Sequence, residues 1–358
     1  MTPLAHEIAA RIRREGPLSV AAFMELCLAH EEHGYYMSRD PLGRSGDFTT
    51  SPEISQMFGE LIGLWCVDMW SKLGSPERFV LAELGPGRGT LMQDALRAAA
   101  IVPAFIGAAN ICFVETSPVL KKEQQKRVPG ASWHRTAENL PDGPLILIAN
   151  EFFDALPIRQ FERTPAGWEE ICVGLAPDAT DGAPAFAFSH KAAPDAEDLL
   201  PEAVHTAPVG AIAETCPLGL TIMESLADRL QQTPGAALII DYGHAVSAPG
   251  DTFQALRAHK FADPLQQPGE ADLTAHVDFA ALQRAAAPLD TYGPVTQGAF
   301  LKALGIDVRA EKLKQKASPA QAKAIDLALT RLTDRETMGS LFKVMAVASP
   351  GLPAPAGI

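Results

Sequence analysis

Residues 79–90 read FVLAELGPGRGT, and this stretch decides the fold. Its first six residues are mostly apolar, as in a buried strand, and residues 90–99 (TLMQDALRAA) follow with a helical pattern. The glycines between them permit positive φ and a close approach of the backbone to a ligand. The free N–H groups at a helix start can hold a polar or anionic ligand group. The stretch therefore predicts a strand–turn–helix unit with a ligand site at its turn.

Similar apolar runs recur along the chain and alternate with helical segments. This alternation predicts an α/β fold, with a mostly parallel, Rossmann-like sheet that carries helices on both faces. A helical segment precedes the sheet, and one long helix is expected from Ser51 as N-cap to Gly74. Further strands are expected at residues 111–115, near 132–133, and at 144–149, 236–241, 290–295 and 342–348.

Composition limits the protein class. The 358 residues are 47% hydrophobic and 20% charged, as in a globular protein with a sizeable core. Acidic residues outnumber basic ones 43 to 30, so nucleic acid is not an expected partner. The five cysteines stand singly, which argues against a metal site or disulfides and favours a reducing compartment. No apolar run approaches the ~20 residues that span a bilayer, so no membrane insertion is expected.

We expect three parts in the chain. Residues 1–75 form an N-terminal helical or lid region, and residues 76–348 form the sheet domain, with insertions at about 161–215 and 297–338. Residues 349–358 (SPGLPAPAGI from 349) form a flexible tail. The sequence does not indicate an oligomeric state.

The glycine spacing separates two kinds of nucleotide site. A dinucleotide fingerprint, GxGxxG, needs glycine or alanine at position 90, where Thr90 stands. The observed pattern places Gly85, Gly87 and Gly89 after Glu83, which is similar to motif I of class I S-adenosylmethionine-dependent methyltransferases. S-adenosyl-L-methionine is therefore the expected cofactor.

Acids accompany this turn. Glu115 ends the second strand, where a carboxylate can accept hydrogen bonds from ribose hydroxyls. Glu83 either meets the positive amino-acid end of the ligand or fixes the glycine loop. Glu138 and Asn139, after the weak third strand, either reach the adenine edge or cap a turn.

Six longer segments occur along the chain in a set order. They are HGYYMSRDPLGRSGDFTTSPEISQMFGE (33–60), LAELGPGRGTLMQDALR (81–97), FVETSPVLKKEQ (113–124), ANEFFDALPIRQF (149–161), IIDYG (239–243) and FADPLQQPGEADLTAHVDF (261–279). These segments resemble the MidA family of class I methyltransferases, the group that contains a mitochondrial complex I assembly factor that methylates arginine. The resemblance implies a protein arginine methyltransferase whose partner is a 49-kDa-type subunit of complex I. Because family-like sequence begins almost at once, a bacterial, cytoplasmic version is expected.

The loop NEFFDALP (150–157) follows an expected strand at the sheet edge where open parallel sheets bind ligands. An arginine acceptor stays protonated, and its repulsion from a sulfonium about 4 Å away is on the order of 4 kcal/mol at an effective dielectric of ~20. Carboxylates that face the guanidinium offset this repulsion. Glu151 and Asp154 are the expected acids, although the spacing of Asp154 departs from that in arginine methyltransferases. Asn150 is expected to orient the loop or to contact the cofactor.

Other residues are weaker candidates. Phe152 and Phe153 either wall the acceptor channel or divide between core and surface. His276 and Asp278 are expected to form a pair that positions the acceptor or a loop.

Two surface segments are also candidates. Residues 43–56 (GRSGDFTTSPEISQ) are hypothesised to fold over the cofactor as a lid, with polar groups from Asp47, Thr50, Ser51 and Gln56. Arg257, His259 and Lys260 form a basic patch that either binds an acidic strip of a partner or is an ordinary solvated face.

Two other functional classes remain open. One is a methyltransferase for a small molecule or a different side chain, with the same cofactor turn. The other is a non-catalytic assembly protein that keeps the cofactor fold.

Overall fold

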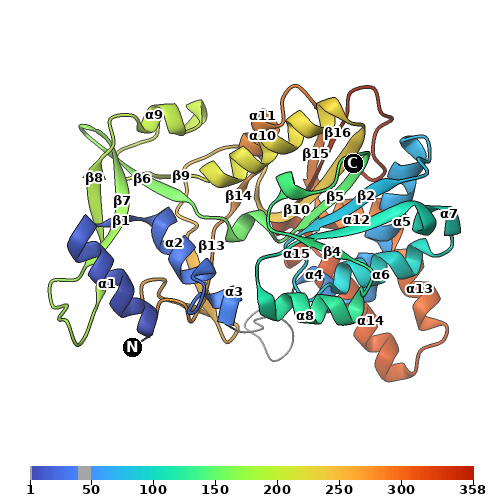
Figure 1. The fold of residues 1–358 in the computed structure, drawn as a ribbon, viewed down its shortest axis with the longest axis horizontal. Helices are drawn as coiled ribbons and strands as arrows, with labels where there is room; N and C mark the ends of the chain where they lie inside the picture. The colour runs from blue at the N-terminus through green and yellow to red at the C-terminus, as the bar shows by residue number, and fades with distance from the viewer. Residues whose placement is uncertain (1, 39–49) are drawn as a thin grey trace. The chain divides into compact units, whose positions relative to one another are not determined.

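The structure is a computed structural model that describes residues 2–38 and 50–358. Its internal contacts divide the chain into two units, whose elements are labelled in Figure 1. The first unit comprises Met1–Phe48, Asp154–Thr221 and Val246–Leu282; the second comprises Thr49–Phe153, Ile222–Ala245 and Gln283–Ile358. The expected N-terminal region, 1–75, thus contributes to both units. Asp47 lies outside the described residues.

The second unit is built on the expected mostly parallel sheet, and the α/β fold class is confirmed (Figure 1). The strand order is β15-β16-β10-β5-β2-β3-β4. Strands β10, β5, β2, β3 and β4 run parallel, whereas β16 is antiparallel to both β10 and β15. The strands are β2 (Phe79–Leu84), β3 (Ala109–Val114), β4 (Ser132–His134), β5 (Leu145–Asn150), β10 (Gly235–His244), β15 (Asp290–Thr296) and β16 (Phe342–Ala348).

Helices cover both faces of this sheet, and alternation along β5 shows how. Ile146 and Ile148 belong to a core cluster with residues of helices α5 and α6. Leu145 and Leu147 point the other way, toward α10. Because a parallel sheet is buried on both faces, its strands are apolar at almost every position. The helices are α5 (Gln56–Lys72), α6 (Thr90–Ala99), α7 (Pro103–Ala108), α8 (Pro118–Arg127) and α10 (Pro217–Gln232).

The expected long helix from Ser51 to Gly74 is broken in two. Helix α4 (Ser51–Ile54) ends at Ser55, whose backbone is extended (φ −161°, ψ 139°). The Ser55 side chain then accepts a hydrogen bond from Met57 N–H and caps α5. Ser51 is the first residue of α4 and not a side-chain N-cap, so the second serine of the segment has the capping role.

The C-terminal part of the second unit packs helices against the same core. The expected insertion at 297–338 forms α12 (Gln297–Ala303), α13 (Ile306–Lys314) and α14 (Pro319–Thr333), and α15 (Met338–Leu341) follows. Residues 349–358, which we expected to be a flexible tail, instead place Leu352, Ala356 and Ile358 against the core cluster. Burial of these apolar side chains accounts for the difference.

The first unit combines N-terminal helices with two antiparallel sheets. One sheet has the order β1-β7-β6-β9, with β8 beside β7, and the other has the order β12-β11-β13. The expected insertion at 161–215 supplies most of the first sheet. The elements are α1 (Pro3–Glu15), β1 (Leu18–Ser19), α2 (Val20–Ala29), α3 (Tyr35–Ser38), β6 (Arg159–Thr164), β7 (Gly167–Leu175), β8 (Phe186–Ala192), α9 (Ala196–Leu199), β9 (Ile212–Thr215), β11 (Gln254–Arg257), β12 (Lys260–Ala262), β13 (Asp272–Thr274) and α11 (Phe279–Ala285).

Residues 2–38 and 50–358 contain neither a membrane-spanning helix nor a metal-binding cluster. None of the helices there combines the length and the apolar character that crossing a membrane requires. The same ranges hold no cluster of three or more histidine, cysteine or acidic side chains that could bind a metal ion.

Candidate functional site

The glycine turn lies at the carboxyl edge of the parallel sheet, between β2 and α6. Gly85, Gly87 and Gly89 have φ of 55°, 53° and 80°, the left-handed region that favours glycine. Gly85 N–H donates to Val114 O at 3.0 Å and thereby extends the β2–β3 ladder by one residue. The turn therefore needs its glycines for backbone conformation, as the sequence predicts.

Phe152 packs directly against this turn. A Cβ atom on Gly85 would lie 2.9 Å from Cδ2 of the Phe152 ring, closer than real Cβ contacts allow. The rings of Phe152 and Phe153 meet edge to face, with centroids 5.4 Å apart, and Phe153 is buried. The two aromatic residues thus divide, with Phe153 in the core and Phe152 beside the glycine turn.

Glu115 follows β3 at the same edge and is held by the protein itself. Its Oε1 accepts hydrogen bonds from Thr116 N–H and Ser117 N–H, both at 2.8 Å, and its Oε2 accepts one from Gln124 Nε2 at 3.0 Å. Burial raises the pKa of this carboxyl, and the hydrogen bonds act in the opposite direction. A carboxylate has about four acceptor positions, so one on Oε2 remains for a further donor.

Gln124, on α8, is a residue that the sequence analysis missed. Its Nε2 also donates to Gly87 O at 2.7 Å, and its Oε1 accepts a hydrogen bond from Trp133 Nε1 at 2.8 Å. It is fully buried and links the glycine turn to Glu115. The helical pattern of residues 118–127 carries no sign of this role, because the partners come from three other elements.

Glu83 is buried within β2, with 3% of its surface exposed. It shares a strand face with Leu81, which packs toward α5, and its charge acts on the pKa of Cys66 of that helix. Burial raises the pKa of Glu83 to about 8. Its Oε2 has no hydrogen-bond partner among the described residues. A buried acceptor of this kind is costly unless a ligand supplies a donor.

Asn150, the last residue of β5, presents a second such acceptor. Its Oδ1 is buried and lacks a partner within the described ranges. Glu83 pairs in register with Ile148, and strand alternation places Asn150 on the face of Ile148. Two buried oxygen acceptors therefore lie on one sheet face, next to the glycine turn.

Glu151 begins the loop after β5 in a left-handed conformation, with φ of 49°. Its N–H donates to Ile240 O at 2.8 Å. Its Oε1 accepts hydrogen bonds from Ser51 N–H at 2.8 Å and from Asn150 Nδ2 at 3.2 Å. The carboxylate is thus oriented by the first turn of α4. A non-glycine residue at positive φ marks a conformation that the surrounding contacts impose.

Asp241 is the second residue that the sequence analysis missed as a site residue. It is fully buried in β10, and its Oδ2 accepts hydrogen bonds from the N–H groups of Phe152 (3.1 Å) and Phe153 (3.0 Å). Its Oδ1 accepts one from Tyr242 N–H at 2.9 Å. An acid that ends an otherwise apolar strand, as in IIDYG, was the available signal.

Asp154 and His276 belong to the first unit. Ala275 N–H donates to Asp154 O at 3.0 Å, and His276 N–H donates to Thr252 Oγ1 at 2.8 Å. The expected His276–Asp278 pair is not formed within the described residues. Asp278 instead accepts hydrogen bonds from Ser247 Oγ and from Ala281 N–H, and so caps α11.

Tyr36 and Asp272 lie in the same unit as Asp154. Tyr36 Oη donates to Asp272 Oδ1 at 2.7 Å. Burial raises the pKa of Tyr36 well above its ordinary value, and the charges of Asp272 and Asp154 add to this effect. The region is therefore a buried cluster of carboxylates and a tyrosine.

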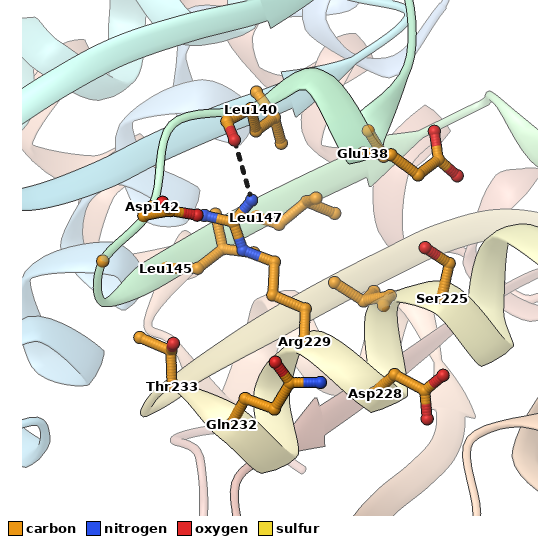
Figure 2. A pocket seen from close by; sticks show the side chains of 13 residues that line it. Glu138, Leu140, Asp142, Leu145, Leu147, Ser225, Asp228, Arg229, Gln232 and Thr233 are labelled. Atoms are coloured by element: carbon orange, nitrogen blue, oxygen red, sulfur yellow. Dashed lines mark hydrogen bonds between the residues drawn. The ribbon is translucent and has the colours of Figure 1, made fainter.

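A cavity lies between α10, the loop at 137–143 and the first half of the central strand β5 (Figure 2). Its volume is about 260 Å³. Glu138, a candidate for the adenine edge, lies in the 3-10 turn Ala137–Asn139 and lines this cavity with Ser225 and Arg229. The Arg229 guanidinium donates to Leu140 O at 3.3 Å, as the dashed line marks. The cavity adjoins the first residues of β5, and its lining does not include the glycine turn.

The chain is similar to known methyltransferases over most of its length. A family model described as S-adenosyl-L-methionine-dependent methyltransferase matches residues 61–295. The mitochondrial protein arginine methyltransferase NDUFAF7 homolog of Drosophila melanogaster is 37% identical, over 96% of this chain and 84% of its own length. The protein of that name in Homo sapiens is 37% identical, over 97% and 83%. A solved structure from Burkholderia thailandensis with bound S-adenosyl-homocysteine has a TM-score of 0.82 and 26% identity, over 99% of this chain and 93% of that one.

Proposed function

The chain belongs to the family of S-adenosyl-L-methionine-dependent methyltransferases, and we propose that its acceptor is an arginine side chain of a protein. Relatives named protein arginine methyltransferases, similar over nearly the whole chain, support this acceptor. The observation that carries the acceptor is the Glu151 carboxylate, which Ser51 N–H and Asn150 Nδ2 orient at the sheet edge. The donor site rests on two buried acceptors without a partner among the described residues, Glu83 Oε2 and Asn150 Oδ1, beside a left-handed glycine turn.

These residues fit the donor. The ammonium group of S-adenosylmethionine would donate hydrogen bonds to Glu83 Oε2 and Asn150 Oδ1. Its positive charge would favour the ionised form of Glu83. Because glycine has no side chain, the backbone of the turn could contact the ligand directly. The remaining acceptor position on Glu115 Oε2 suits a ribose hydroxyl. When bound, S-adenosylmethionine would supply the methyl group of its sulfonium to an arginine nitrogen. The nitrogen loses one proton, and S-adenosyl-homocysteine is left.

Glu151 would hold the acceptor. Its carboxylate is already oriented by Ser51 N–H and Asn150 Nδ2, so little reorganisation is needed to receive a guanidinium. A negative charge there would offset the repulsion between two cations, which is on the order of 4 kcal/mol. We also assign Asp154 as the second acid and His276 as a positioning residue, on the basis of their place in the family-like segments.

The finer identity of the acceptor rests on family resemblance. We propose a subunit of respiratory complex I of the 49-kDa type, methylated in the bacterial cytoplasm. The five cysteines are free thiols, as a reducing compartment would leave them.

The test is methylation of a lysate from cells that lack the protein, with isotopically labelled S-adenosylmethionine and mass spectrometry of the labelled side chains. We expect methylarginine in one protein. Glu151→Gln should abolish this transfer and keep the donor Kd within a few-fold, and the exposed Glu197→Gln serves as the matched control. Label on a small molecule or on another side chain would support the alternative acceptor. Normal activity of Glu151→Gln would contradict its proposed role.

A further inference from the structure

The tip of the β11–β12 hairpin, residues 257–261, combines basic side chains with an aromatic one; we call it the basic hairpin. Arg257, Ala258, His259 and Lys260 are all exposed, and Phe261 has 79% of its surface exposed. The segment therefore offers a partner both positive charge and apolar surface.

The two central residues of the turn adopt a backbone conformation that their residue types disfavour. Ala258 and His259 have φ of 51° and 60°, a conformation that hairpins normally assign to Asn-Gly or Asp-Gly. A non-glycine residue is unfavourable in this conformation because its Cβ approaches the following carbonyl oxygen. Arg257 and Lys260 face each other in register, where like charges repel. Positive φ at two non-glycine residues marks a turn conformation that the surrounding contacts impose.

Nothing in the described part of the chain neutralises the two cations. No carboxylate there forms an ion pair with Arg257 or Lys260; the Arg257 guanidinium donates instead to Gln267 Oε1. The chain as a whole carries a formal charge of −13. The positive charge of the hairpin tip is therefore opposite in sign to the net charge of the chain.

We propose that the basic hairpin docks into an acidic surface of a protein partner, the protein whose arginine is methylated, an identity that rests on the proposed function. Strand alternation puts Lys260 and Phe261 on opposite sides of β12. The matching surface is therefore a concavity with carboxylates on one wall and apolar side chains on the other. Two fixed positive charges on a strongly acidic chain are too few for a nucleic-acid site.

The experiment measures binding of the full chain to a fluorescein-labelled peptide that alternates glutamate with glycine and leucine, by fluorescence anisotropy at low and high salt. A second peptide carries glutamine in place of each glutamate. We expect the glutamate peptide to bind about tenfold more tightly, with the difference lost at high salt.

Variants locate the site. Arg257→Glu/Lys260→Glu should weaken binding of the glutamate peptide about tenfold, and Phe261→Ser should weaken it at both salt concentrations. Arg14→Glu/Lys191→Glu changes the net charge equally at exposed residues of the same unit and should bind as wild type. Thermal melts check that all variants fold. Equal binding by wild type and the 257/260 variant, or binding to phosphatidylglycerol vesicles in place of the peptide, would overturn the proposal.

A second readout separates this inference from the proposed function. In the lysate assay, the 257/260 variant should raise the KM for the methylated protein and leave kcat intact. If the 257/260 variant methylates the protein as wild type does and Glu151→Gln does not, the docking role of the basic hairpin is contradicted. The proposed methyltransferase function is then still supported. If no arginine is labelled but the peptide result holds, the surface stands and its partner is not a methyl acceptor.

Discussion

The Asp241 carboxylate holds the backbone of Phe152: Oδ2 accepts the Phe152 N–H at 3.1 Å and the Phe153 N–H at 3.0 Å. These two amides follow Glu151 directly, so a side chain of β10, one residue beyond the last pair of β10 with β5, fixes the loop that begins at the end of β5. The same loop presses the Phe152 ring onto Gly85. The donor turn and the proposed acceptor acid are therefore coupled through one buried carboxylate.

We expect Asp241→Asn to lower kcat about a hundredfold, because small displacements of a positioned group cost catalysis of that order. The amide is isosteric, but its NH2 group can face the two N–H donors in place of an acceptor. The donor Kd, measured by calorimetry, should change by only a few-fold. Methylation kinetics provide kcat.

A control for loss of stability alone is Glu60→Gln. Glu60 is buried on α5 and pairs with Arg97 and Arg309, away from the loop at 151–153. Its change should lower the melting temperature and leave kcat within a few-fold. A purely structural role for Asp241 would be indicated if both variants lost kcat in proportion to stability.

Gly85→Ala tests the turn itself. The positive φ of 55° costs an alanine about 1–2 kcal/mol, and its Cβ would lie 2.9 Å from the Phe152 ring. We expect the Kd for S-adenosylmethionine to rise at least about tenfold as Phe152 moves. Gly74→Ala is the matched control, since its φ is 83° and nothing lies within 4 Å of the added Cβ. Equal donor affinity in the two variants would count against the turn as the donor site.

The backbone elements of the sheet were predictable because they depend on local pattern. Strands β2, β5 and β10 are buried on both faces and therefore read as continuous apolar runs. The acids that end strands, Glu115 and Glu151, could be placed at one sheet edge by the same reasoning. The same reasoning does not predict which residues the side chains at these strand ends contact.

Partners distant in sequence explain the omissions. Gln124 and Asp241 act through hydrogen bonds to residues 37 and 88 or more positions away, and periodicity does not reveal these. The break at Ser55 depends on its extended φ and on a cap that Ser51 could equally have supplied. Ser51 instead gives its N–H to Glu151, a contact across 100 residues.

Gln124→Leu should lower both the stability of the protein and its affinity for the ligand at the glycine turn. The change leaves Gly87 O and Trp133 Nε1 without their buried partner, at about 1–3 kcal/mol each. We expect a lower free energy of unfolding in urea and a Kd for S-adenosyl-homocysteine raised about tenfold. Gln232→Leu, an exposed glutamine of α10, should change neither quantity. An unchanged Kd in a destabilised Gln124→Leu protein would restrict Gln124 to a structural role.

Glu83 predicts an unusual pH dependence of stability. Burial raises its pKa from 4.5 to about 8. Between these values the folded protein holds a proton that the unfolded chain has released, so the free energy of unfolding falls as the pH rises through this window. The loss amounts to at most about 5 kcal/mol. Urea unfolding of the donor-free protein from pH 5 to 8 should show it, and Glu83→Gln should remove it.

Glu60 gives the opposite sign and serves as the comparison. Arg309 and Arg97 hold the pKa of Glu60 below its ordinary value, against the effect of burial, so its stabilisation is present at neutral pH and is lost as the pH falls below about 4.5. Saturating S-adenosylmethionine should flatten the Glu83 dependence, because an ammonium beside this carboxyl favours its ionised form. Parallel pH curves for wild type and Glu83→Gln would show that Glu83 does not hold a proton in the folded protein. A slope that the donor leaves unchanged would place the ammonium elsewhere.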